Sequence, residues 1–175
     1  MKLRIRNTRL TLQVIGWLQM IGGIFGLFLM AYLMLKTGAI NGGVLLIFCM
    51  GIFLFSYSIY CGKRLIWDKQ KETGIICSVI NYFLQLFQWI VVGCGITYSS
   101  GAAITIGISK TVLNFTAGAV FTNFSMSINS DDDFFIKLNL FALLIIIVLF
   151  DMLKELKTEK SKVAENINAP ELSQL

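Results

Sequence analysis

Long apolar stretches, separated by short charged or polar segments, dominate the chain. Crossing about 30 Å of hydrocarbon takes about 20 helical residues, and four stretches qualify. We expect membrane-spanning helices at about 10–35, 40–61, 74–98 and 134–153. The prediction is therefore an all-α integral membrane protein, with a single domain of four transmembrane helices over residues 1–153.

A further uncharged stretch, 111–130, is long enough to cross but is rich in Ser, Thr and Asn. A fifth crossing would also move the basic C-terminal segment to the outer face, so we assign this stretch to an outer loop, 99–133. Apolar and polar residues alternate with period two over 104–109 and 124–129, as in half-buried strands. We predict a structured loop, with a small β-hairpin or meander favoured over a helical re-entrant or interfacial segment. The aspartates at 131–133 should cap the fourth helix.

Lysine and arginine set the expected orientation, because positively charged loops stay on the cytoplasmic side. With both termini inside, twelve of the 15 Lys and Arg residues are cytoplasmic, and Lys36, Lys110 and Lys137 are outside. We therefore expect a multi-pass protein of the cell inner or plasma membrane with cytoplasmic N and C termini. The tail, 154–175, should be cytoplasmic, helical at first and disordered at its end.

The amino-acid composition limits the partners and the kinds of chemistry that we expect of this chain. The chain is 56% apolar and 14% charged, against about 45–50% and about 25% in soluble domains. A net charge of +5 beside apolar spans favours the bilayer and its anionic lipid headgroups, rather than nucleic acid, as partners. Histidine is absent, which removes the commonest general base and the usual haem and zinc ligands. We expect a protein that is not an enzyme and holds no cofactor or metal.

The third expected span carries a polar stripe. Ser78, Asn81, Gln85 and Gln88 share one helix face, because they are spaced by three, four and three residues. Such a stripe must face protein or water rather than acyl chains. Its amides either bond neighbouring helices or line a path for a solute or ion. Tyr57, in the second span, is a further candidate member of the stripe.

A glycine-rich face on the first span is the expected partner of this stripe. It consists of Gln19 and four glycines, Gly16, Gly22, Gly23 and Gly26. Such glycines let two helix backbones approach closely, so helix packing is their expected role. By helix rise alone, Gln19 lies at about the depth of Gln85, and we expect these two side chains to meet.

The segment between the second and third spans is basic and aromatic. Its candidate contact residues are Lys63, Arg64, Trp67, Lys69 and Lys71. This composition is typical of a segment that lies on anionic lipid, and a docking surface for a soluble partner would have the same composition.

Two functions fit these features. The first is a non-catalytic accessory, regulatory or assembly subunit, which offers its basic cytoplasmic loops to another membrane or cytoplasmic protein or forms a homo-oligomer. The second is an oligomeric channel, pore or membrane-perturbing effector lined by the polar stripe. It needs several copies, because one four-helix bundle has no room for a lumen.

Overall fold

The computed structural model describes residues 8–38, 41–68, 70–91, 94–109, 113–116, 122–127 and 135–168. The helices in these parts are α1 (Thr8–Lys36), α2 (Gly42–Trp67), α3 (Lys71–Leu86) and α4 (Leu140–Asn168). The strands are β1 (Phe87–Val91), β2 (Cys94–Ser100), β3 (Thr105–Ser109), β4 (Leu113–Thr116), β5 (Thr122–Ser127) and β6 (Phe135–Asn139). The described protein is mostly helical, with a small sheet between α3 and α4.

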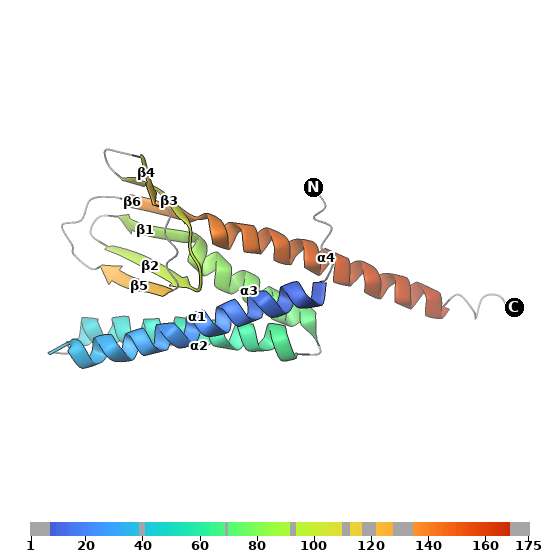
Figure 1. The fold of residues 1–175 in the computed structure, drawn as a ribbon, viewed down its shortest axis with the longest axis horizontal. Coiled ribbons are helices and arrows are strands. Elements are labelled where there is room, and N and C mark those ends of the chain that lie inside the picture. Colours follow the sequence, from blue (N-terminus) through green and yellow to red (C-terminus); the bar gives the residue numbers. More distant parts are fainter. Residues whose placement is uncertain are drawn as a thin grey trace, which may run out of the picture.

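Helices α1 and α2 form a long antiparallel hairpin (Figure 1). Among the described residues, they are the two helices long and apolar enough to cross a membrane. Helix α2 begins at an N-cap, where the Asn41 side chain accepts a hydrogen bond from the Val44 backbone N–H at 2.9 Å. It continues past the expected end to Trp67, so Lys63 and Arg64 lie on its last turns rather than in a loop.

Glycines of α1 bring the two helices of the hairpin close together. A Cβ at Gly16 would lie 2.7 Å from the nearest side-chain atom of α2, and one at Gly23 would lie 2.6 Å from another. Gly26 lies against the ring of Phe55 in α2. The expected pairing of this glycine face with the third helix is therefore wrong, because three of its four glycines pack on α2.

The expected third span does not continue as a helix. Helix α3 ends at Leu86, and the chain forms β1 and β2 where a helix over 74–98 was predicted. Aromatic and β-branched residues dominate β1, as is typical of strands. The fourth span differs similarly, since 135–139 is strand β6 and α4 starts only at Leu140.

The six strands form one antiparallel sheet in the order β4-β3-β6-β1-β2-β5. The strand prediction for the two alternating loop segments is confirmed by β3 and β5. These strands do not form a hairpin with each other, because β3 pairs with β4 and β6 whereas β5 pairs with β2. The aspartates at 131–133 lie outside the described residues.

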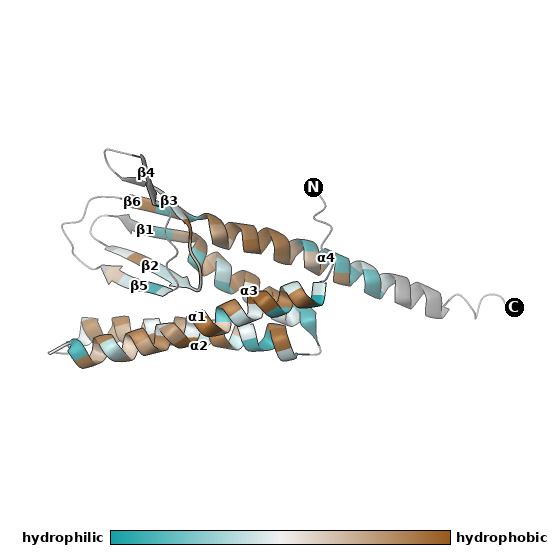
Figure 2. Cartoon of the chain, in the orientation of Figure 1, coloured by the Kyte–Doolittle hydropathy of each residue, from teal (hydrophilic) through white to brown (hydrophobic). Residues whose placement is uncertain are grey.

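Helix α3 packs between the hairpin and α4. One apolar cluster joins α1, α2, α3 and α4 and includes Leu12, Leu65, Tyr82 and Leu149. A second cluster, which includes Phe55 and Phe124, joins the hairpin to β2 and β5. Figure 2 shows that the first half of α4 is apolar and that the coloured part of the helix after it is mostly hydrophilic.

Basic residues gather toward one end of the molecule, where α1 begins, α2 turns into α3 and α4 runs out (Figure 1). We call this the basic end. Its described basic residues are Arg9, Lys63, Arg64, Lys71, Lys154, Lys157 and Lys160. The expected tail is helical through Asn168, and residues 169–175 lie outside the described part.

Candidate functional site

A cluster of buried polar side chains lies where α1, α2, α3 and β2 meet. We call it the polar cluster; its members are Gln19, Ser58, Ser78, Asn81, Gln85, Tyr98 and Ser100. Each of them is at most 2% exposed. Amides and hydroxyls buried this deeply require hydrogen-bond partners, so the cluster constrains how the four elements fit together.

Ser58 of α2 is the centre of the cluster. Its hydroxyl lies 3.1 Å from the backbone oxygen of Gln19 in α1, to which it donates. It accepts a hydrogen bond from Asn81 Nδ2 of α3 at 3.1 Å, and it lies 2.9 Å from the Ser100 hydroxyl at the end of β2. One side chain therefore connects three helices and the sheet.

Two glutamines extend the network in different directions. Gln19 Oε1 accepts a hydrogen bond from the Ser78 hydroxyl at 3.0 Å, which joins α1 to α3. Gln85 Oε1 accepts from the Ser100 backbone N–H at 3.0 Å, which joins α3 to β2. The predicted meeting of Gln19 with Gln85 is replaced by these two separate contacts.

Close packing of β2 against α1 explains this difference. A Cβ at Gly22 would overlap the backbone at Ser100 and Gly101, so the end of β2 lies directly against α1. Gly101 has a φ of +98°, which only glycine adopts easily. The turn after β2 therefore supplies partners that the sequence pattern alone would have assigned to another helix.

Tyr98 ties the sheet to the middle of the hairpin. Its hydroxyl lies 3.0 Å from the backbone oxygen of Leu54 and 3.1 Å from Asn81 Oδ1, and it can donate to either. Its ring lies 5.5 Å from the ring of Phe55, centroid to centroid. Tyr98 thus contributes both a hydrogen bond and apolar ring packing to the contact between the sheet and the hairpin.

The other predicted members of the stripe lie elsewhere. Gln88 is 5% exposed, but it lies in β1 and pairs in register with Lys137 of β6. Tyr57 is half-buried, and its hydroxyl lies 3.4 Å from the backbone oxygen of Cys77 in α3. It therefore contacts α3 beside the polar cluster rather than within it.

Sequence reasoning missed Asn139, a buried residue at the end of β6 that directly precedes α4. Its Oδ1 accepts from the backbone N–H groups of Phe141 at 3.1 Å, Ala142 at 3.3 Å and Ile104 at 3.3 Å. Asparagine directly before a long apolar run is an N-cap pattern, and this signal was available in the sequence. The predicted cap at 131–133 is wrong because the helix begins later.

Four buried polar atoms have no hydrogen-bond partner among the described residues. They are Gln19 Nε2, Gln85 Nε2, Ser99 Oγ and Asn139 Nδ2. Two of the four, Gln19 Nε2 and Gln85 Nε2, belong to the polar cluster. The members of the polar cluster are amides and hydroxyls, and no carboxylate or imidazole is among them. Such groups suit hydrogen bonding rather than proton transfer at neutral pH. The cluster therefore has the chemistry of a structural joint, by which we mean a set of hydrogen bonds that holds the helices and the sheet together.

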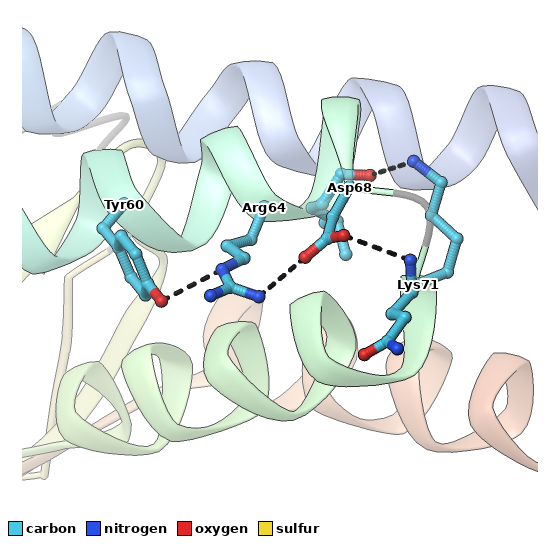
Figure 3. A network of polar contacts seen from close by, with 6 residues as sticks. Tyr60, Arg64, Asp68 and Lys71 are labelled. Carbon is cyan, nitrogen blue, oxygen red and sulfur yellow. Dashed lines mark hydrogen bonds and ion pairs between the residues drawn. The ribbon is translucent and has the colours of Figure 1, made fainter.

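A second polar feature is a groove at the basic end, which we call the basic groove. It has a volume of about 320 Å³, and its described lining consists of Tyr60, Lys63, Arg64, Trp67 and Asp68. Figure 3 shows Arg64 held between two neighbours. Its Nε donates to the Tyr60 hydroxyl at 3.0 Å, and a terminal nitrogen pairs with Asp68 at 2.7 Å.

Lys71 lies beside the groove but has a different role. Its Nζ donates to the backbone oxygens of Leu65 at 3.0 Å and Ile66 at 2.8 Å, so it caps the C-terminal end of α2 (Figure 3). Lys69, another predicted contact residue, lies outside the described residues. Of the predicted set, Lys63, Arg64 and Trp67 are brought together in the groove.

Comparisons with known proteins return no matching family model, no matching curated protein and no matching solved structure. Functional argument therefore rests on the polar cluster and the basic groove.

Proposed function

We propose that this chain is a non-catalytic multi-pass membrane protein that acts as an accessory, regulatory or assembly subunit and docks a partner at its basic end. The observation that carries this proposal is the burial of Ser78, Asn81 and Gln85 in the polar cluster, where each is 0% exposed. These polar side chains make their hydrogen bonds within one chain, and this favours a structural role over a path for a solute.

The lengths of the helices support a specific arrangement in the membrane. At 1.5 Å per residue, α1 is about 43 Å long and α3 about 24 Å. The apolar part of α4, Leu140 to Phe150, is only about 16 Å long. In our proposal the α1–α2 hairpin crosses the bilayer, α3 and α4 rise from the cytoplasmic side, and the sheet completes the outer half.

The edge of the sheet favours a role as a subunit. Strand β5 lies against α1, where the Thr122 hydroxyl donates to the Gly22 backbone oxygen at 3.0 Å. Among the described strands, β4 pairs only with β3. An unpaired strand edge is costly in hydrocarbon. A chain inserted as proposed is therefore stabilised by a protein neighbour at β4, whether another copy or a different subunit.

The basic end provides the docking surface of the proposal. Lys154, Lys157 and Lys160 are exposed on the second half of α4. Lys160 also pairs with Glu72 of α3 at 2.8 Å, which holds this part of α4 near the start of α3. Glu155 and Glu159 are exposed on the same stretch, so lysines outnumber glutamates there by three to two. An excess of positive charge steers acidic partners and raises association rates.

Purification from native membranes tests the docking proposal. A tagged full-length chain should recover a stoichiometric partner, and the triple variant Lys154→Glu, Lys157→Glu, Lys160→Glu should lose it. Lys36→Glu, a charge reversal at the far end of α1, should retain it. Equal recovery by the triple variant would refute docking at the basic end, and a chain found in the soluble fraction would refute membrane placement.

The alternative is an oligomeric pore, and the four unpartnered buried polar atoms are the observation that favours it, because water could satisfy them. Purified chain in liposomes should pass no more K⁺ or dye than empty liposomes if the subunit proposal is right. Flux above that background that disappears in Gln85→Leu would favour the pore instead.

A further inference from the structure

The basic groove combines charge and aromatic side chains where an apolar helix ends. Tyr60 is 45% exposed and Trp67 is 57% exposed. Trp67 packs edge-on against Trp17 of α1, with ring centroids 5.9 Å apart. Exposed aromatic residues near the ends of membrane helices lie at headgroup depth, so the groove faces the layer that contains lipid phosphates.

Arg64 is pre-positioned to bind an anion in this groove. Its guanidinium lies 5.3 Å from the centre of the Tyr60 ring and is fixed by the Tyr60 hydroxyl and Asp68. Two of its three nitrogens are thereby occupied, and the remaining terminal nitrogen can donate. Lys63, exposed on the same stretch of α2, adds a second cation. Guanidinium and ammonium groups together bind phosphate oxygens well.

We propose that the basic groove binds the phosphodiester of an anionic phospholipid, with Lys63 and Arg64 as its ligands and Tyr60 and Trp67 as its aromatic walls. This inference rests on the proposed membrane placement but not on docking of a protein partner. The described lining carries two cations and one carboxylate, and one phosphodiester neutralises the excess charge. A zwitterionic lipid brings an extra ammonium group that leaves this excess uncompensated.

The exposed apolar side chains along α2 and α3 suit the acyl chains of the same lipid. Phe53 on α2 is 69% exposed, and Ile76 and Ile80 on α3 are 49% and 48% exposed. Phe53 precedes Tyr60 by about two helical turns and therefore shares its face of α2, and Ile76 and Ile80 lie on α3, the next helix along the chain. The bound molecule would thus be a lipid that lies along the protein, with its headgroup in the groove.

Native mass spectrometry of the full-length protein in detergent tests the proposal, with phosphatidylglycerol, phosphatidylethanolamine and phosphatidylcholine as the added lipids. We expect preferential retention of phosphatidylglycerol. Lys63→Gln should weaken it about tenfold, since one charge-assisted hydrogen bond to phosphate is worth about that factor or more. Arg64→Lys should weaken it less than Arg64→Gln, because lysine keeps the positive charge whereas glutamine removes it. Lys36→Gln, which removes an exposed charge at the other end of α1, should bind as wild type.

Two further arms complete the test. Melting temperatures of each variant without lipid show that it is folded, so weakened binding cannot be attributed to unfolding. Inorganic phosphate, added alone, should raise the melting temperature little. Equal retention of the three lipids, or of phosphatidylglycerol by Lys63→Gln and wild type, would overturn the site. Stabilisation by inorganic phosphate matching that by the lipid would identify free phosphate as the ligand and would likewise overturn the proposal. Each outcome is independent of whether Lys154, Lys157 and Lys160 hold a partner.

Discussion

Removing the Ser58 hydroxyl perturbs the centre of the polar cluster without changing the shape of the helix. Ser58→Ala deletes the hydrogen bond to the Gln19 backbone oxygen and the contacts with Asn81 and Ser100. Hydrogen bonds between membrane helices are worth about 0.6 kcal/mol on average and up to about 1.7 kcal/mol. Leaving a buried polar group without a partner costs about 1–3 kcal/mol. We therefore expect a loss of about 2–4 kcal/mol in the free energy of unfolding.

The matched control is Ser56→Ala, the same substitution two residues earlier on α2, where the side chain is exposed. Its expected effect is within about 0.5 kcal/mol, as for surface substitutions in general. The measurement is unfolding of the purified protein in mixed micelles by a denaturing detergent, followed by circular dichroism. If Ser58→Ala destabilises the protein no more than Ser56→Ala does, the cluster is not the joint that we describe.

Three further changes test the packing and the caps. Gly23→Ala should destabilise the hairpin by about 1–3 kcal/mol because its Cβ would lie 2.6 Å from Ile59 and 2.8 Å from the Phe55 backbone oxygen; Gly42→Ala, in open space, is the control for detergent unfolding. Asn139→Ala should cost about 1–2 kcal/mol by removing the cap of α4, and unchanged stability would refute the cap. A Gln19→Ala, Ser78→Ala double-mutant cycle should give a coupling of about 0.6 kcal/mol, whereas Gln19→Ala with Gln85→Ala should give almost none. The opposite result would restore the pairing expected from helix rise.

The hairpin could be predicted because its signal is local. An uncharged, mostly apolar run from Leu10 to Leu35 indicates a long helix by composition alone, and the glycine face indicates a close neighbour without identifying it. The neighbour is α2, because the connection between α1 and α2 is short and consecutive elements usually lie side by side.

The end of α3 could not be read from hydropathy. Residues 87–98 carry no charge and were predicted as the second half of a membrane helix, yet Phe87–Val91 forms β1 and Cys94–Ser100 forms β2. Hydropathy records only that a segment is apolar, and period-two alternation in this stretch is interrupted by glycines. Gln88 was assigned to the helical stripe for the same reason, although the chain has already become a strand at that position.

The polar cluster was predictable in part. The spacing of Ser78, Asn81 and Gln85 identified the α3 face, because helical periodicity is a local property. Ser100 and Tyr98 were missed, because their partners are distant in sequence and no local pattern indicates that β2 lies against Gly22. Non-local strand packing of this kind depends on the whole fold.

Access of water to the polar cluster tests the central claim most directly. A Ser78→Cys variant, with the native cysteines Cys49, Cys61, Cys77 and Cys94 replaced by alanine, keeps the volume of the side chain close to that of serine. In sealed inside-out membrane vesicles, whose outer surface is the cytoplasmic face, it should resist a membrane-impermeant thiol reagent during the time in which a Lys63→Cys control is fully modified, and it should react once the protein is unfolded in detergent. Modification of folded Ser78→Cys at the rate of Lys63→Cys would show a water-filled path and contradict the account of a sealed structural joint.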